Sequence, residues 1–461
     1  MLGSVEDPAS IGEDRTTGKI VAGRAAIRLG RSQIAPAQGS RPTPKWARVD
    51  PMTQRQLPRW NDLKPMIGVR RPDLNATRRR LAQALTIADV ARLARRRAPR
   101  AVFDYVDGAA ESETSLHRAR AAFEAVEFQP QILRDVSGLS TDTTILGRPA
   151  GVPYGFAPTG FTRLMHQAGE VAVARVAGRH GIPYAVSTLG TSTPEAVAAA
   201  APVGARLWFQ LYVWRDRAAA EDLMARADAA GYEALVLTVD VPVAGARHRD
   251  SRNGLSVPPA LSARTLADIA THPAWWFDVL TTEAIDFAAL AGWDGTIGEK
   301  LNALFDPTMT LADLDWVRQH WRKPLIVKGI QTVADAESVV GAGADAIVLS
   351  NHGGRQLDRA PVPLALLPQV RAALGPTVEI ILDSGIRSGG DIAAALALGA
   401  DSTLVGRAYL YGLMAGGEAG VERVAEILTG ELRRTMALLG VSRTDQLAPH
   451  HVRLLGDTAG A

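Results

Sequence analysis

The chain of 461 residues contains no cysteine. This absence excludes disulfides, thiolate zinc sites, iron–sulfur clusters and a cysteine nucleophile. Long apolar runs are also missing, since no uninterrupted stretch reaches the length of a membrane span. The first residues, MLGSVEDPASIGEDRTTG, lack the basic and apolar regions of a secretory signal. We therefore expect a cytoplasmic protein that is neither exported nor anchored by a transmembrane helix.

The chain also lacks a large excess of either charge. Its formal net charge is +3, and 21% charged beside 47% hydrophobic residues is typical of a globular protein. Basic residues nevertheless concentrate between Arg70 and Arg100, in RRPDLNATRRR and ARLARRRAPR. The cluster is either a solvated helix face or a contact for anionic lipid or nucleic acid. We expect a solvated face, with peripheral contact to the inner face of the cell membrane as the alternative, and no nucleic-acid partner.

Two segments differ in their apolar periodicity. Residues 1–80 contain Gly, Pro, Ser and Arg without a sustained period, and we interpret them as a mobile or surface-draped extension. In TIADVARLARRRA, Thr86 and Asp89 have the spacing of a capping box, and apolar residues follow at helical spacing. Residues 81–461 are therefore expected to form the folded domain.

Eight short apolar or β-branched runs recur from Gly155 onward, and most precede alanine-rich stretches of helical character. The runs are GFAPTG (155–160), YAVSTLG (184–190), RLWFQLY (206–212), ALVLTVD (234–240), PLIVKGI (324–330), AIVLSNHGG (346–354), EIILDSGI (379–386) and STLVGRA (402–408). Continuous apolar runs suit parallel strands that are buried on both faces. Eight such β-then-α units predict an α/β fold, the (β/α)8 TIM barrel.

Nearly every run begins apolar and ends in polar, glycine or charged residues, such as Gln210, Thr238 and Ser350. In a barrel these ends meet at the C-terminal rim, where the active sites of this fold lie. The segment between Asp240 and Pro324 is too long for one crossover, so it predicts a long insertion after strand 4. The insertion is either a water-excluding lid or a packing or oligomer-contact segment.

The loops after the seventh and eighth runs read DSGIRSGGD and VGRAYLYG. Barrels commonly bind phosphate with these two loops, because glycines let backbone N–H groups approach the anion. Gly385, Arg387, Gly406 and Arg407 are therefore expected to hold a phosphate, with the arginines supplying charge-assisted hydrogen bonds. Ordinary turn glycines with surface arginines are the alternative.

Lys328 ends the fifth run, VKGI, inside an apolar stretch. A buried lysine needs an anionic partner or a depressed pKa. Three roles fit this position: a Schiff-base nucleophile, a charge beside a cofactor that becomes negative on reduction, and a structural ion pair.

The segment SNHGGRQLD places His352 and Arg355 just beyond the sixth run. Histidine titrates near neutrality and is a common general base, while the arginine fork matches a carboxylate. Asp240, at the end of the fourth run, could orient the imidazole and stabilise its charged form. A base beside a carboxylate clamp predicts a carboxylic-acid substrate.

These motifs, with LTVDVPV, FQLY, APTG and FDYVDGAAESE, stand in an order that resembles the FMN-dependent α-hydroxy acid dehydrogenases and oxidases. The resemblance covers roughly residues 81–455. Within that family, APTGFTRLMH, RDSRNG and GRAYLYGLMAGGEAGV are similar to the respiratory-type flavin L-lactate dehydrogenases.

The resemblance implies a role for each residue of the predicted site. The cofactor FMN would contact Pro158, Thr159, Gly160, Ser187, Gln210, Thr238, Lys328, Ser350, Asp383, Gly385, Arg387, Gly406 and Arg407. Within that set Lys328 would stabilise the reduced flavin, and Asp383 would bind the ribityl chain. The substrate carboxylate would contact Tyr105, Arg247 and Arg355. Catalysis would depend on His352 as base, on Asp240 as its partner, and on Tyr212, which would bind the substrate hydroxyl.

The implied reaction is oxidation of a small L-2-hydroxy acid, L-lactate to pyruvate, with FMN as the electron sink. Both a hydride and a carbanion mechanism need the same residues. The first 80 residues show no haem motif, so electrons would pass to a quinone or a soluble carrier. The resemblance also implies a homo-oligomer, a tetramer.

Two rival functions follow from the same residues. An oxidase of the same chemistry would use O₂ and release peroxide. A lyase would form a Schiff base on Lys328 and need no flavin. The pocket for the substrate side chain is expected near Gly160, Phe161 and Leu189.

Overall fold

The computed structural model describes residues 59–64, 73–254, 262–288 and 305–455. The chain divides into two compact units, Met1–Arg70 and Arg71–Ala461. In the first unit the described residues form one short helix, α1 (Trp60–Leu63). Most of the predicted extension of residues 1–80 lies outside the described residues, whereas helix α2 (Ala76–Gln83) belongs to the second unit.

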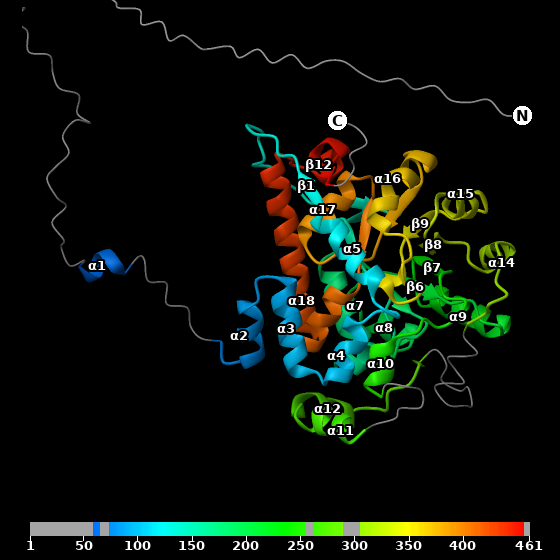
Figure 1. The fold of residues 1–461 in the computed structure, drawn as a ribbon, viewed down its shortest axis with the longest axis horizontal. Coiled ribbons are helices and arrows are strands. Elements are labelled where there is room, and N and C mark those ends of the chain that lie inside the picture. The colour runs from blue at the N-terminus through cyan, green and yellow to red at the C-terminus, as the bar shows by residue number, and fades with distance from the viewer. Residues whose placement is uncertain (1–58, 65–72, 255–261, 289–304, 456–461) are drawn as a thin grey trace, which may run out of the picture. The chain divides into compact units, whose positions relative to one another are not determined.

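Eight parallel strands form a closed barrel in the second unit (Figure 1). They are β4 (Tyr154–Phe156), β5 (Pro183–Ser187), β6 (Arg206–Leu211), β7 (Ala234–Thr238), β8 (Leu325–Ile330), β9 (Ala346–Leu349), β10 (Glu379–Leu382) and β11 (Ser402–Val405). Consecutive strands are neighbours, and the pairing of β11 with β4 closes the barrel. The predicted (β/α)8 barrel and its eight strands are confirmed.

Helices connect the barrel strands and lie around the barrel (Figure 1). They are α6 (Thr162–Met165), α7 (Gly169–Arg179), α8 (Pro194–Ala200), α9 (Arg217–Ala229), α15 (Val333–Gly341), α16 (Pro363–Leu374), α17 (Gly389–Ala397) and α18 (Arg407–Leu439), with the 3-10 turn η3 (His352–Gly354). Side-chain caps begin several of them: Ser388 forms a capping box with Asp391 at α17. The helix α18 bends at Gly416 and Gly417, whose backbone angles are not helical.

The segment that precedes the barrel contacts both ends of the barrel, the C-terminal rim and the opposite, N-terminal end. It contains α3 (Ile87–Arg97), α4 (Arg100–Asp107), α5 (Thr114–Glu124), β1 (Val126–Phe128) and the hairpin β2 (Thr143–Ile145) with β3 (Arg148–Ala150). The predicted capping box of Thr86 and Asp89 begins α3. At the C-terminal end, η4 (Thr444–Gln446) and η5 (Pro449–His451) lead to β12 (Val452–Leu454), which pairs with β1.

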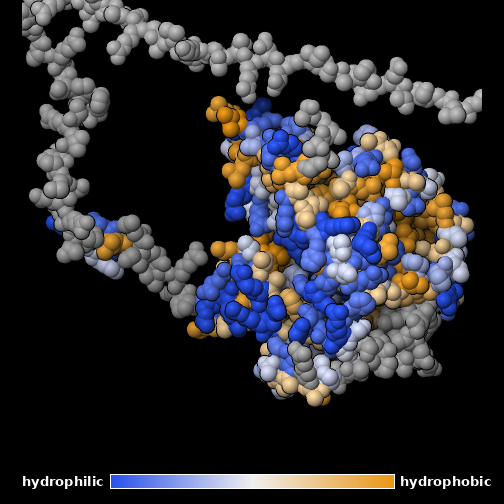
Figure 2. Space-filling view, viewed as in Figure 1, coloured by the Kyte–Doolittle hydropathy of each residue, from blue (hydrophilic) through white to orange (hydrophobic). Residues whose placement is uncertain are grey.

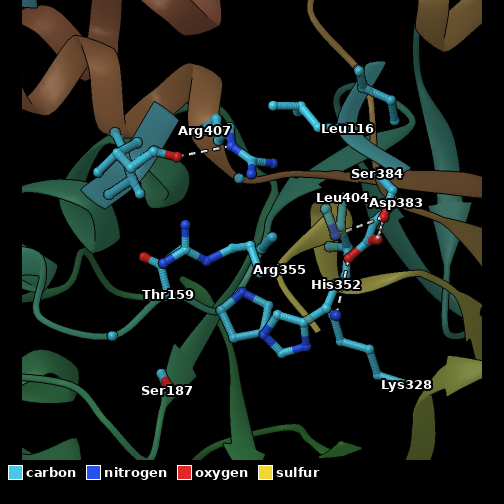
Figure 3. A pocket seen from close by; sticks show the side chains of 18 of the residues that line it. Leu116, Thr159, Ser187, Lys328, His352, Arg355, Asp383, Ser384, Leu404 and Arg407 are labelled. Atoms are coloured by element: carbon cyan, nitrogen blue, oxygen red, sulfur yellow. Dashed lines mark hydrogen bonds and ion pairs between the residues drawn. The ribbon is translucent and has the colours of Figure 1, made fainter. Parts of the chain in front are cut away.

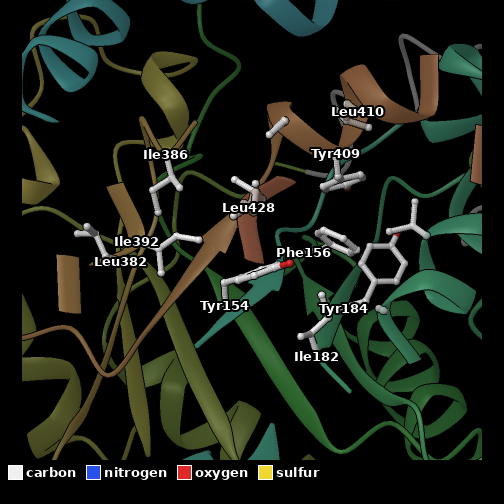
Figure 4. Close-up of a cluster of buried hydrophobic side chains, with 14 of the residues drawn as sticks. Tyr154, Phe156, Ile182, Tyr184, Leu382, Ile386, Ile392, Tyr409, Leu410 and Leu428 are labelled. Atoms are coloured by element: carbon white, nitrogen blue, oxygen red, sulfur yellow. The ribbon is translucent and has the colours of Figure 1, made fainter. Parts of the chain in front are cut away.

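Apolar packing fills both sides of the barrel wall, as the continuous apolar runs predict. Small and branched residues such as Ala185, Val236 and Ile381 fill the barrel interior beside Ile145 of the β2–β3 hairpin. On the outer side, Tyr154, Phe156, Tyr184 and Tyr409 form part of the larger core (Figure 4). These rings join β4 and β5 to α18, so the cluster links the barrel wall to the helix that follows its last strand.

The insertion after β7 contains α10 (His248–Arg252), α11 (Ala263–Ala270), α12 (Pro273–Leu280) and α14 (Ala312–His320). Helix α12 docks on the rim: Asp278 pairs with Arg97 of α3, and the Trp275 indole donates to the Leu164 carbonyl at 2.7 Å. Buried Phe287 packs on Phe161, with ring centroids 4.4 Å apart. The described part of the insertion makes packing contacts, and water exclusion by this segment stays a prediction.

Most of the predicted basic cluster lies on the helices α2 and α3, whereas Arg70 and Arg71 lie outside the described residues and Arg100 begins α4. Figure 2 shows hydrophilic surface over α2 and α3. The arginines exposed there are Arg78, Arg79, Arg80, Arg92, Arg95 and Arg96, whereas Arg97 is partly buried against α12. Within the described ranges, no helix is both long and apolar enough to span a membrane.

Candidate active site

A cavity opens at the C-terminal rim of the barrel (Figure 3). Fifteen of the predicted site residues line it: Tyr105, Pro158, Thr159, Gly160, Ser187, Tyr212, Arg247, Lys328, His352, Arg355, Asp383, Gly385, Arg387, Gly406 and Arg407. Four others, Gln210, Thr238, Asp240 and Ser350, do not line it but lie at the ends of the neighbouring strands. The cavity thus brings together residues from Tyr105 on α4 to Arg407, which lie about 300 positions apart in the sequence.

Several cavity residues were not predicted from the sequence. They are Val106, Leu116, Ala157, Gly353, Ser384, Ile386, Leu404 and Leu410, while Leu189, expected near the substrate side chain, also lines the cavity. Ser384, Ile386 and Gly353 lie inside motifs that were recognised, so their position beside predicted residues was an available signal. Leu116 comes from α5, far from any barrel strand, and no local pattern marks it.

His352 and Asp240 form a hydrogen-bonded pair at the rim. The Nδ1 of His352 lies 3.0 Å from Oδ1 of Asp240, whose side chain is 1% exposed. Because a carboxylate only accepts, Nδ1 carries the hydrogen and Nε2 of the neutral ring keeps a lone pair. Burial alone would raise the pKa of Asp240, but His352 and Lys328 outweigh it, so this pKa lies below its ordinary value. The pair can therefore accept a proton at Nε2 and stabilise the resulting imidazolium.

The backbone around His352 is held in an unusual conformation. His352, Gly353 and Gly354 all have left-handed φ values, of 56°, 62° and 75°. A Cβ at Gly354 would lie 2.8 Å from the backbone nitrogen of Leu116, so only glycine fits there. Ser350 accepts from the His352 N–H at 3.0 Å, and Ser384 accepts from the Gly353 N–H at 3.1 Å. The backbone conformation of the motif SNHGG therefore fixes the position of the His352 imidazole.

Lys328 is buried beside two oxygen partners. Its Nζ lies 3.1 Å from Asp383 and 3.0 Å from the Ser350 hydroxyl, and its side chain is 4% exposed. Burial alone would lower the pKa of this amine, but Asp383 and Asp240 raise it above its ordinary value. A lysine that stays protonated cannot attack a carbonyl, which disfavours the Schiff-base role. Lys328 instead offers a positive charge to the cavity.

Arginines crowd the opposite wall of the cavity (Figure 3). Burial, then the nearby charges of Arg355 and Arg387, lower the pKa of Arg407 to about 9. Burial and the charge of Arg247 likewise lower the pKa of Arg355. Like charges held this close favour an anion between them, because an anion would offset both the repulsion and the lost hydration. The wall is thus suited to phosphate and carboxylate groups.

The C-terminal end of α4 holds two of these arginines in place. Arg355 donates to the carbonyls of Tyr105 and Gly108 at 2.7 and 3.1 Å. Arg407 donates to the carbonyls of Val106 and Gly108 at 2.8 and 2.7 Å. The free carbonyls of a helix C-terminus carry partial negative charge, which suits guanidinium groups. Helix α4 therefore orients an arginine of the predicted substrate site and one of the predicted phosphate site together.

Tyrosines complete the predicted substrate side of the cavity. The Arg355 and Arg247 guanidinium groups lie 5.0 and 5.3 Å from the ring centroid of Tyr105, at cation–π distance. Burial raises the pKa of Tyr212 above its ordinary value, so its hydroxyl stays protonated at neutral pH. A neutral hydroxyl can both donate and accept a hydrogen bond at the substrate.

Unpaired polar groups beside the cavity test whether a flavin fits. Ser187 donates to Oε1 of Gln210 at 2.8 Å, which leaves the Gln210 Nε2 as the free end of the amide. Among the described residues, neither this Nε2 nor the Thr238 hydroxyl has a partner, although both side chains are buried. Buried donors without partners are costly, and the carbonyl oxygens and ring nitrogens of a flavin would satisfy them. With the arginines for phosphate and Lys328 for the ring, the residues present fit FMN.

Comparison with known proteins gives a consistent result. Residues 94–454 match the model of the FMN-dependent dehydrogenase family. A Mycobacterium tuberculosis protein provisionally named L-lactate dehydrogenase is 57% identical over 401 residues, which cover 87% of this chain and 97% of that protein. An L-lactate dehydrogenase from Caulobacter sp. is 41% identical over 367 residues, covering 78% of this chain and 96% of that protein.

Two solved structures are also similar to this chain over most of its length. The monotopic membrane protein (S)-mandelate dehydrogenase is 36% identical with a TM-score of 0.78, and the match covers 81% of this chain and 100% of that chain. A mandelate oxidase bound to (S)-mandelic acid is 38% identical with a TM-score of 0.69, covering 80% of this chain and 98% of that chain.

Proposed function

Because the chain belongs to the FMN-dependent dehydrogenase family, we propose that it oxidises a small L-2-hydroxy acid, L-lactate, to the 2-oxo acid pyruvate. The observation that carries this proposal is the shared cavity. His352, paired with Asp240, lines the same cavity as Arg355, so a base and a carboxylate clamp face one space. The names of the relatives that span most of the chain favour lactate among the 2-hydroxy acids.

Each step assigns a task to a residue of this chain. Arg355, Arg247 and Tyr105 bind the substrate carboxylate, and the Tyr212 hydroxyl binds the substrate hydroxyl. His352 removes a proton at Nε2, and the carboxylate of Asp240 stabilises the imidazolium that forms. Bound FMN supplies the acceptor for the two electrons that leave the substrate. The same tasks apply whether the proton comes from the hydroxyl or from Cα.

The cofactor would lie between the strand ends and the arginine wall. Gln210, Thr238, Ser187 and the loop Ala157–Gly160 would contact the ring. Asp383 and Ser350 flank Lys328, which would place its charge beside the ring. Gly385, Arg387, Gly406 and Arg407, on the loops after β10 and β11, would hold the phosphate.

Anaerobic mixing with a panel of 2-hydroxy acids tests the reaction. The protein should be yellow as isolated, and L-lactate should bleach the flavin without added nicotinamide, while D-lactate should leave it oxidised. A colourless protein that L-lactate does not alter, or one that borohydride traps covalently with a substrate at Lys328, would refute the proposal in favour of a lyase.

We propose that a quinone or a soluble carrier, rather than O₂, then receives the electrons. Re-oxidation of the bleached protein by a quinone analogue should be much faster than by air. Peroxide released at the rate of lactate consumption would assign the chain to the oxidases instead.

The exposed arginines of α2 and α3 support a further proposal, that the protein is cytoplasmic and docks peripherally on anionic lipid. A monotopic membrane protein among the structural neighbours is compatible with such docking. Sedimentation with vesicles containing anionic lipid should carry the protein down at low salt and release it at high salt. Absence of binding at low salt would contradict this.

Two further proposals concern the N-terminal extension and the oligomeric state. We propose that residues 1–80 form an extension, part of which is dispensable for folding and for FMN binding. A chain that starts at Arg71, the first residue of the second unit, should retain flavin. We also propose a homo-oligomer, a tetramer, which the mass from sedimentation equilibrium tests.

A further inference from the structure

Tyr409 is a buried tyrosine that the reaction does not use. It lies on α18, two residues after the predicted phosphate ligand Arg407, and its side chain is fully buried. Its ring packs against Phe156 and Tyr184, with centroids 5.0 and 6.3 Å away (Figure 4). Both partner rings belong to barrel strands, so the direction of the Tyr409 hydroxyl is fixed from two sides.

The Tyr409 hydroxyl bonds to the loop that forms one wall of the cavity. It donates to the Ala157 carbonyl at 3.0 Å and forms a second hydrogen bond with the Thr159 hydroxyl. Residues Ala157, Pro158, Thr159 and Gly160 all line the cavity. One hydroxyl therefore ties two residues of this loop to the helix that also carries Arg407.

The chemistry of the three oxygens fixes the direction of these bonds. A carbonyl oxygen can only accept, so the single hydrogen of Tyr409 goes to Ala157. The hydrogen of Thr159 must then go to the Tyr409 oxygen, because each hydroxyl has one hydrogen. Thr159 keeps only acceptor lone pairs for a group in the cavity. A bound ring would consequently meet Thr159 with an N–H group rather than with a carbonyl oxygen.

We infer that Tyr409 is a positioning residue for FMN: it holds the loop Ala157–Gly160 and makes Thr159 a hydrogen-bond acceptor toward the cofactor. Arg407 and Tyr409 lie on the same turn of α18. This helix therefore fixes the position of the loop Ala157–Gly160 relative to Arg407, the predicted phosphate ligand. This inference rests on the proposed function, since it assumes that FMN occupies the cavity.

Tyr154 offers a matched control within the same aromatic cluster. Its side chain is also fully buried and its ring packs on Phe156, with centroids 6.4 Å apart. Its hydroxyl, however, donates to the Ala425 carbonyl at 3.2 Å and lies 3.1 Å from the Thr429 hydroxyl, both on α18 away from the cavity. Tyr409→Phe and Tyr154→Phe therefore remove the same buried hydroxyl, and only the first removal touches the cavity loop.

The experiment measures FMN affinity by titration of the apoprotein, followed by the visible circular dichroism of the bound flavin. Tyr409→Phe should raise the dissociation constant of FMN about 10-fold, the loss expected for one or two hydrogen bonds. It should also change the visible dichroism of the bound ring. Tyr154→Phe should leave the FMN affinity within about twofold and the dichroism unchanged, as loss of a remote core hydroxyl predicts.

A double-mutant cycle separates positioning from a general loosening of the core. Thr159→Val removes the acceptor that Tyr409 orients, so adding Tyr409→Phe to it should raise the dissociation constant by much less than 10-fold. Wild-type affinity in Tyr409→Phe, equal losses in both tyrosine variants, or full additivity with Thr159→Val would each overturn the inference. Failure of the wild-type apoprotein to bind FMN would instead overturn the proposed function.

Discussion

Lys328 and Asp383 form a buried ion pair, with Nζ 3.1 Å from Oδ2 and side chains that are 4% and 9% exposed. The two residues come from strands that are not adjacent: Lys328 lies on β8 and Asp383 follows β10, with β9 between the two strands. Their charges are held together where water cannot screen them, so the pair bears on folding as well as on the cofactor.

The first prediction concerns this pair. Lys328→Met leaves Asp383 buried without its cation and should lower the free energy of unfolding of the apoprotein by about 3–5 kcal/mol. Adding Asp383→Asn should recover part of the loss, because the amide carries no charge to bury. Chemical denaturation of both variants measures this. A double variant less stable than Lys328→Met would contradict the assignment.

The second prediction concerns the base. His352→Gln should retain FMN but slow anaerobic flavin reduction by L-lactate about 10²- to 10⁴-fold, since general base catalysis contributes that much. Stopped-flow absorbance gives the rate. His320→Gln, on the exposed end of α14, serves as the control and should reduce flavin at the wild-type rate. Near-normal bleaching in the His352 variant would refute its role.

The third prediction concerns the carboxylate clamp. Arg355→Lys should lower kcat/KM for L-lactate about 10- to 100-fold, because a point charge cannot reproduce a bidentate fork. Steady-state kinetics with an artificial acceptor measure the effect. Arg359→Lys, four residues later on the exposed surface, should be neutral. Equal kinetics in the two variants would remove Arg355 from the substrate site.

The fourth prediction concerns stability at the opposite end of the barrel. Burial raises the pKa of Glu379 to about 7 from an ordinary value of 4.5, and its Oε2 accepts from the Leu146 N–H of the β2–β3 hairpin turn. The folded state thus binds this proton more tightly than the unfolded chain. The contribution to stability is complete below about pH 4.5 and is lost as the pH rises through about 7.

Glu379→Gln should therefore flatten the decline of the melting temperature between pH 5 and pH 8 without changing flavin reduction. Melting curves across this range in wild type and variant provide the measurement. Parallel curves for the two proteins would show that Glu379 does not titrate in the folded state.

Much of the site follows from sequence because of strand direction. Each barrel run is apolar until its last residues, and parallel strands deliver all of those last residues to one rim. Strand direction alone therefore groups Lys328, His352 and the two predicted phosphate loops at one rim. The capping box at Thr86 was likewise local, since a helix N-terminus satisfies its own N–H groups within four residues.

Other features needed the tertiary structure because their partners are far apart in the chain. The hydrogen bond of Asp240 to His352 spans 112 residues, and that of Arg407 to Gly108 spans 299. In the sequence, nothing distinguishes Tyr409 from other aromatic residues of the core, or Glu379 from any other first residue of a strand. Whether a buried hydroxyl or carboxyl group has a hydrogen-bond partner depends on which loop packs against it in the folded protein. The amino-acid sequence determined which chemistry reaches the rim, and the packing of α4, α18 and the hairpin decided how each group there is held.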